Sequence, residues 1–252
     1  MLGALLPSNV FGFLLIFARV GAIIMVAPAL GEILIPARVR LAIALTTTLA
    51  IWPVASQSLP AAPDSVIGSG LIIVGEVLVG LLIGGTARMI MAALHVGGSV
   101  IAFQTGLAVS QTFDPTQGIQ AAIVSSFLTL LGVVTVFAAD LHLLILQAIS
   151  NSYNLFPPGN YAPFGDFAQF AIRQVAASFA LGIQIAAPFI VYGLTFYVGL
   201  GLIARLMPQL QVFFIAMPMN IFLGFVLMLF LVSGIMMWFL QHFQDGLAPF
   251  LR

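Results

Sequence analysis

Repeated long apolar runs are the feature that most constrains this chain. Stretches close to the roughly 20 apolar residues that cross a bilayer fall at about 10–30, 39–55, 66–94, 121–149, 170–204 and 212–240. Only 6% of the residues are charged, whereas a soluble domain carries about 25%. The sequence therefore predicts an all-α, polytopic helical membrane protein with about six long apolar segments. Pro28 and Pro188 lie inside such runs and should kink or interrupt them.

The arginines predict an orientation, because the chain has no lysine. Arg38 and Arg40 lie in the first connection between apolar segments, Arg88 near the third and Arg205 in the fifth. Odd connections share one side of the membrane in a six-segment chain, and the positive-inside rule assigns that side to the cytoplasm. The last two segments meet at a short connection with Arg205, Pro208 and Gln209, so we expect a helical hairpin with a cytoplasmic turn.

Six ionisable residues lie in or beside the apolar runs, where each costs at least about 2.5 kcal/mol unless it finds a partner or water. A paired or snorkelling structural charge is the simpler interpretation for each, and a direct role in moving a substrate or ion is the alternative. They are Arg19, Glu76, Arg88, Asp140, His142 and Arg173.

One stripe of residues predicts close helix packing. Glu76, Gly80, Gly84 and Arg88 recur every four residues, so they lie along one helix face, with a small-xxx-small step at its centre. Glu76 and Arg88 are about 18 Å apart along the axis, too far to pair with one another. We expect each to find a partner on another helix or subunit and interpret the stripe as a subunit interface. A chance spacing among 24 glycines is the alternative.

Enzyme chemistry and nucleic-acid binding find no support in the residues. Metalloprotease, Walker A and nucleophile-elbow motifs are all missing, and with no cysteine there is no thiolate site. Seven acids balance seven bases, so the chain has no basic surplus for a polyanion. We expect no catalytic residue, no metal and no cofactor.

The connection at about 97–120 has an unusual composition for a solvated loop. Its polar residues are nearly all uncharged, which suits a wet lumen, and its glycines permit displacement. Phe103, Leu107 and Phe113 could pack against a constriction. An ordinary loop on either side of the membrane is an equally good interpretation of these residues.

Three stretches carry a resemblance to a known family. The first runs from Phe17-Ala18-Arg19-Val20-Gly21 through Ala27-Pro28 to Arg38-Val39-Arg40, the second from Gly106-Leu107 through Phe113-Asp114-Pro115 to Asp140-Leu141-His142, and the third from Leu206-Met207-Pro208-Gln209 to Met217-Pro218-Met219-Asn220. Together they resemble the FliR family, an integral component of the flagellar type III export gate. The resemblance covers essentially the whole chain, although Leu141 stands where the family usually has Gly.

The resemblance implies a non-enzymatic subunit with two parts. Residues 1–169 resemble FliP, and residues 170–252 resemble a FliQ-like helical hairpin. The resemblance also favours a gate over an ordinary loop for the connection at 97–120. The plug residues would be Phe103, Gly106, Leu107, Ser110, Phe113, Asp114, Pro115 and Gly118.

The implied setting is a hetero-oligomeric export gate in the bacterial inner membrane, within the flagellar basal body. Its partners would be FliP and FliQ, with FlhB and FlhA close by, membrane lipid around it, and unfolded flagellar proteins passing through. A secondary transporter or ion channel is the alternative function, motivated by the interior charges and prolines. It would need paired broken helices around a midplane site. An intramembrane enzyme is a weaker third.

Overall fold

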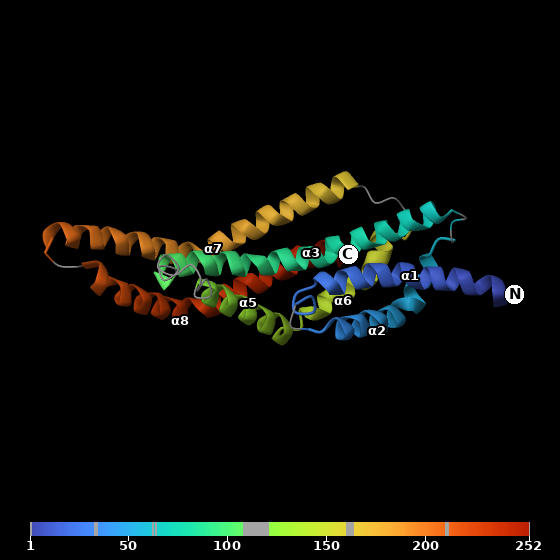
Figure 1. Ribbon diagram of the computed structural model, residues 1–252, viewed down its shortest axis with the longest axis horizontal. Coiled ribbons are helices and arrows are strands. Elements are labelled where there is room, and N and C mark those ends of the chain that lie inside the picture. The colour runs from blue at the N-terminus through green and yellow to red at the C-terminus, as the bar shows by residue number, and fades with distance from the viewer. Residues whose placement is uncertain are drawn as a thin grey trace. The chain divides into compact units, whose positions relative to one another are not determined.

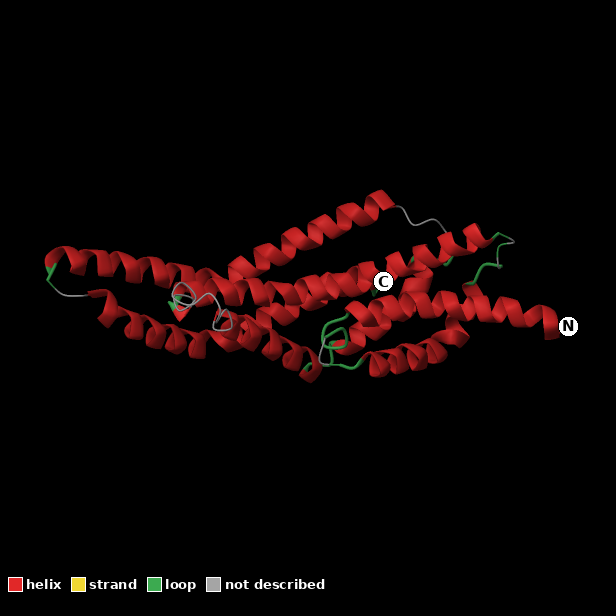
Figure 2. Cartoon of the chain, in the orientation of Figure 1, coloured by secondary structure: helices red, strands yellow, loops and turns green. Residues whose placement is uncertain are grey.

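The computed structural model describes residues 2–32, 35–61, 63, 65–107, 121–159, 164–209 and 212–251. Across these ranges the regular elements are all helices (Figure 2). They are α1 (Leu2–Val26), α2 (Ala37–Ala55), η1 (Ser56–Ser58), α3 (Val66–Gln104), α5 (Ala121–Ala138), α6 (His142–Leu155), α7 (Phe164–Leu206), α8 (Val212–Leu247) and η4 (Ala248–Phe250). Five of the described helices are long and apolar enough to span a bilayer, and the bent pair α5–α6 makes a sixth candidate. The predicted all-α polytopic class is confirmed.

Two prolines mark the end of α1 and the start of α2. α1 ends at Val26, two residues before Pro28, whose ring removes an N–H and cannot continue the helix. Ala29 then takes a left-handed backbone with φ 65°. Pro36 precedes α2, where its missing N–H is no loss. Pro28 thus ends a helix, as expected, whereas Pro188 lies inside the continuous helix α7.

The predicted single segment at 121–149 is wrong in one respect, because the structure breaks it. α5 and α6 meet at an angle of 70°. Asp140 lies at the break with φ 56°, a left-handed conformation that ends a right-handed helix. Among non-glycine residues Asp and Asn adopt it most readily. The bend therefore depends on the backbone preference of Asp140, whereas a hydropathy scale records only its charge.

The third segment is longer than predicted, and part of the expected loop at 97–120 is helical. α3 continues through Gly97 and Gly98 to Gln104. Both glycines lie against other helices: a Cβ on Gly98 would come within 2.5 Å of Ser125 Cα, and one on Gly97 within 3.0 Å of the Gly182 carbonyl. They therefore serve close backbone packing inside a helix rather than loop flexibility.

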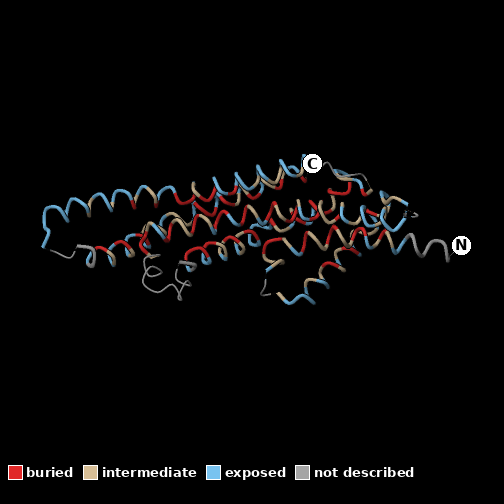
Figure 3. The backbone as a smooth tube through the Cα atoms, turned by 45° about the horizontal axis from the view of Figure 1, so that its top comes forward, coloured by how far each residue is buried: buried red, intermediate tan, exposed pale blue. Residues whose placement is uncertain are grey.

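The chain divides into two compact units. Unit 1 comprises Met1–Ile90, Val136–Val175 and Phe243–Arg252, and unit 2 comprises Met91–Thr135 and Ala176–His242. In unit 1, α1 and α2 run side by side (Figure 1), with the rings of Phe13 and Trp52 6.1 Å apart. In both units buried residues follow one side of the helices, while the last turns of α7 are exposed (Figure 3).

Candidate functional site

A polar junction lies where α3 ends in unit 2. Asn220 of α8 is 3% exposed, and its Nδ2 donates to the backbone carbonyl of Gln104 over 3.2 Å. The Tyr192 hydroxyl of α7 donates to Asn220 Oδ1 over 2.7 Å. One buried amide thus connects three helices, and both ends of that amide are satisfied, as a buried polar group requires.

Glycines on both neighbouring helices make room for the end of α3. A Cβ on Gly193 of α7 would overlap the Gln104 side chain, and one on Gly224 of α8 would overlap Thr105. Gly106 then turns the chain with φ +78°, and a Cβ there would lie 3.1 Å from Asn220 Nδ2. Only glycine adopts this conformation without strain, so the chain leaves α3 directly beside Asn220.

The predicted plug residues fall on both sides of this turn. Phe103 is 71% exposed on the last turn of α3, and Gly106 and Leu107 lie in the turn itself. Ser110, Phe113, Asp114, Pro115 and Gly118 lie outside the described residues. The described residues of the predicted plug therefore lie at the end of α3, and the plug itself stays a prediction.

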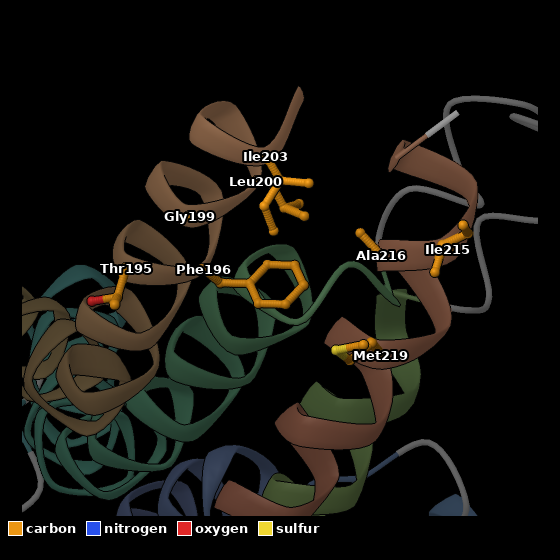
Figure 4. A pocket seen from close by; sticks show the side chains of 8 residues that line it. All are labelled: Thr195, Phe196, Gly199, Leu200, Ile203, Ile215, Ala216 and Met219. Atoms are coloured by element: carbon orange, nitrogen blue, oxygen red, sulfur yellow. The ribbon is translucent and has the colours of Figure 1, made fainter. Parts of the chain in front are cut away.

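A cavity of about 340 Å³ separates α7 from α8 in the same unit (Figure 4). Phe196 and Leu200 point into it from α7, and Met219 points into it from α8. A much smaller hollow, lined by Phe196, Ala216, Gly106 and Asn220 among others, adjoins the polar junction.

Unit 1 contains a buried charge cluster. Arg19 of α1 is 1% exposed, and its Nε donates to Glu76 Oε2 of α3 over 2.6 Å. Its Nη1 donates to the Ser152 carbonyl over 2.8 Å, and its Nη2 to the Phe156 carbonyl over 2.7 Å. These carbonyls belong to the last turn and C-cap of α6, where a cation is favoured. The Ser152 carbonyl also accepts the Phe156 N–H over 2.9 Å. The guanidinium also lies 4.4 Å from the Tyr153 ring centroid.

The stripe predicted on α3 packs against α1 of the same chain. Glu76 pairs with Arg19, which confirms that it finds a partner on another helix. A Cβ on Gly80 would lie 2.5 Å from the Arg19 carbonyl, and one on Gly84 2.8 Å from the Ile23 carbonyl. Arg88 is exposed and makes no ion pair among the described residues. A subunit contact along this stripe stays a prediction, with Arg88 as its exposed residue.

The hairpin turn lies where the sequence places it. Arg205 is in the last turn of α7, and Pro208 and Gln209 are exposed in the connection to α8. α7 and α8 meet again at the Tyr192–Asn220 hydrogen bond, so they form a hairpin in unit 2. The location of this turn on the cytoplasmic side of the membrane remains a prediction.

The sequence did not single out Asn220 or Tyr192 as site residues, and it gave Arg19 no partner. Asn220 does fall in the stretch Met217–Asn220 that carries the family resemblance, which is the one signal that points to it. Among the described residues no group of three or more His, Asp or Glu side chains is placed to hold a metal ion.

Comparisons with known proteins agree with this picture. The sequence profile of "Bacterial export proteins, family 1" matches residues 10–246. The chain is 40% identical to the flagellar biosynthetic protein FliR of Caulobacter vibrioides over 236 residues, covering 94% of each chain. It is 30% identical to FliR of Bacillus subtilis, covering 88% of this chain and 86% of the relative.

A more distant relative is the surface presentation of antigens protein SpaR of Salmonella typhimurium, 26% identical over 225 residues, covering 87% of this chain and 82% of the relative. Fold and matches together define a multi-span membrane component of a bacterial flagellar or type III protein export apparatus. The chain belongs to the FliR family of bacterial export proteins.

Proposed function

We propose that this chain is a structural and gating subunit of the flagellar type III protein export channel, which passes unfolded flagellar proteins across the bacterial inner membrane. Membership of the FliR family supports the channel. The polar junction at Asn220 supports the gate, because it fixes the base of the 97–120 connection to α7 and α8. Such an anchor restricts the positions that a closing segment can take, because it holds one end of the segment against two helices.

The proposed setting is a hetero-oligomer in the flagellar basal body. FliP and FliQ are its proposed sister subunits, with FlhB and FlhA close by. In this proposal residues 1–169 are the FliP-like part and residues 170–252 the FliQ-like hairpin. The many exposed apolar side chains on α7 and α8, such as Leu194, Phe222 and Phe230, provide surface for sister subunits as well as for lipid.

The transporter alternative loses part of its motivation. Arg19 and Glu76 were two of the interior charges that suggested an ion or substrate site. Each now has its main partner in the other, and Arg19 donates its remaining bonds to α6. A pair that neutralises itself and closes a helix end needs no transported ion to explain it.

Deletion of Ser110–Gly118 tests the gate. We expect the variant to assemble, because the deletion leaves Gln104, Asn220 and Tyr192 in place, and to make the membrane leaky to small solutes. Solute entry is measured in cells that carry the wild-type or the deleted chain. Recovery of the same copurifying subunits from both strains controls for assembly. A complex that assembles fully and stays tight after the deletion would contradict the gating role.

Purification of the tagged full-length chain tests the setting separately. FliP- and FliQ-like chains should copurify from the native host in mild detergent. Stable recovery as a monomer or homodimer, without such partners, would overturn the export-gate assignment.

A further inference from the structure

The cavity between α7 and α8 is almost wholly apolar. It is lined by Thr195, Phe196, Gly199, Leu200, Ile203, Ile215, Ala216 and Met219. The single polar side chain, Thr195, donates its hydroxyl to the Val191 carbonyl over 2.9 Å, so it has no free donor to offer. A space without polar partners does not hold ordered water. At about 340 Å³ it is more than twice the roughly 150 Å³ apolar cavity that binds benzene in an engineered protein.

Exposed apolar side chains line the cavity between α7 and α8. Ile203 is 46% exposed, Ile215 63% and Met219 52%. Both helices are apolar enough to span a membrane, and between Arg173 and Arg205 α7 carries no charged residue. Hydrocarbon can therefore enter from the side without crossing a polar barrier.

One positive charge accompanies this end of the hairpin. Arg205 lies in the last turn of α7, two residues beyond the cavity-lining Ile203, and is exposed. The described residues of unit 2 contain no Asp or Glu, so no carboxylate side chain there can neutralise it. A long arginine side chain at a helix end extends to the headgroup level of a bilayer, where an anionic phosphate complements it.

We infer that the α7–α8 cavity binds one acyl chain of an anionic phospholipid, whose headgroup phosphate lies within reach of Arg205. The apolar lining selects the hydrocarbon chain, and Arg205, which has no carboxylate partner in the described part of unit 2, selects the negative headgroup. The inference needs only that the hairpin lies in a membrane, and it does not depend on the proposed gate.

Two glycines of α7 provide a matched pair for the test. A Cβ on Gly199, which lines the cavity, meets nothing within 4 Å, and neither does one on Gly201, which does not line it. Gly199→Leu therefore adds a side chain to the cavity lining from a Cβ that meets no protein atom, while Gly201→Leu adds the same side chain to the exposed surface of the same helix. Both substitutions raise helix propensity equally. A difference in lipid labelling between the two variants therefore reports whether the cavity holds the lipid.

The probe is phosphatidylglycerol with a photoactivatable group on one acyl chain, in nanodiscs of phosphatidylcholine that hold the tagged full-length chain and its copurifying subunits. We expect labelling of the peptides containing Ile203 and Met219, loss of that labelling in Gly199→Leu, and its retention in Gly201→Leu. Equal labelling of the two variants, or absence of labelling at both peptides because another subunit fills the space, would overturn the inference.

The same nanodiscs test whether the Arg205 charge selects an anionic headgroup. Arg205→Gln should reduce labelling by phosphatidylglycerol about fivefold, the equivalent of one arginine near an anionic surface, and leave labelling by a phosphatidylcholine probe unchanged. Arg173→Gln, at the other end of α7, is the control and should alter neither. A wild-type chain that takes both probes equally would show that the headgroup is not selected, and the assignment to an anionic lipid would fail.

Discussion

The side-chain amide of Asn220 and the backbone carbonyl of Gln104 are 116 positions apart in sequence and form a hydrogen bond of 3.2 Å. Asn220→Ala removes the only side-chain donor to the Gln104 carbonyl among the described residues, and it leaves the Tyr192 hydroxyl with only its longer bond, 3.2 Å, to the backbone carbonyl of residue 220. The expected loss of stability is about 1–3 kcal/mol, measured as a lower thermal unfolding temperature of the purified full-length chain. Asn154→Ala, at an exposed position of α6, is the control. An unchanged temperature in Asn220→Ala would show that water replaces the amide.

Arg19→Met should be far more damaging than a change at an exposed arginine. It leaves the Glu76 carboxylate and the Phe156 carbonyl without the Arg19 donor and takes from the Ser152 carbonyl one of its two donors, and breaking a buried pair in this way costs about 3–5 kcal/mol. We expect little folded chain to accumulate in membranes, whereas Arg88→Met should accumulate normally. Glu76→Gln should be milder than Arg19→Met, since it keeps an acceptor for Arg19 Nε and leaves the bonds to α6. Similar accumulation of all three variants would contradict a structural role for the cluster.

Gly80→Ala should separate α1 from α3. The new Cβ would approach the Arg19 carbonyl at 2.5 Å, and overpacking of this kind costs about 1–3 kcal/mol. Gly75→Ala on the same helix meets nothing within 4 Å and should be neutral or slightly stabilising, because alanine is the better helix former. Thermal unfolding of both purified variants distinguishes the two effects. Equal unfolding temperatures would mean that α1 shifts away at no cost.

A single cysteine at position 209 tests the orientation, and the native chain has no cysteine to remove first. If the hairpin turn is cytoplasmic, Gln209→Cys in intact cells reacts only with a membrane-permeant reagent. Gln57→Cys, exposed in η1 and expected on the opposite side, should react with an impermeant one. The reverse pattern would invert the topology.

Apolar length predicted the helices well, because a run of that length satisfies its backbone in a bilayer only as a helix. It failed where single residues decide the path. Asp140 breaks a predicted segment through its left-handed backbone, and Gly98, expected in a loop, lies inside α3 where Ser125 packs closely against it. Neither property is visible in hydropathy, since both depend on a neighbour or on one dihedral angle.

The candidate site was less predictable, because its bonds join residues distant in sequence. Spacing along α3 indicated that Glu76 needs a partner on another helix, but it could not choose Arg19 among the arginines. Asn220 is the single polar residue between Val212 and Val232 of α8, and helix periodicity alone does not connect it to Gln104. Such pairings are set by which helices become neighbours, and local patterns carry little of that information.

The Arg19–Glu76 pair also implies an order of assembly. Both residues precede α6 in the chain, so the ribosome delivers them first, and they can neutralise one another while the early helices enter the membrane. Ser152 and Phe156 arrive later and meet a guanidinium already held in place. The first helix thereby carries the arginine that binds the end of α6, a segment made more than a hundred residues later. Truncating α1 should therefore leave the end of α6 without these hydrogen bonds, even though every residue of α6 is intact.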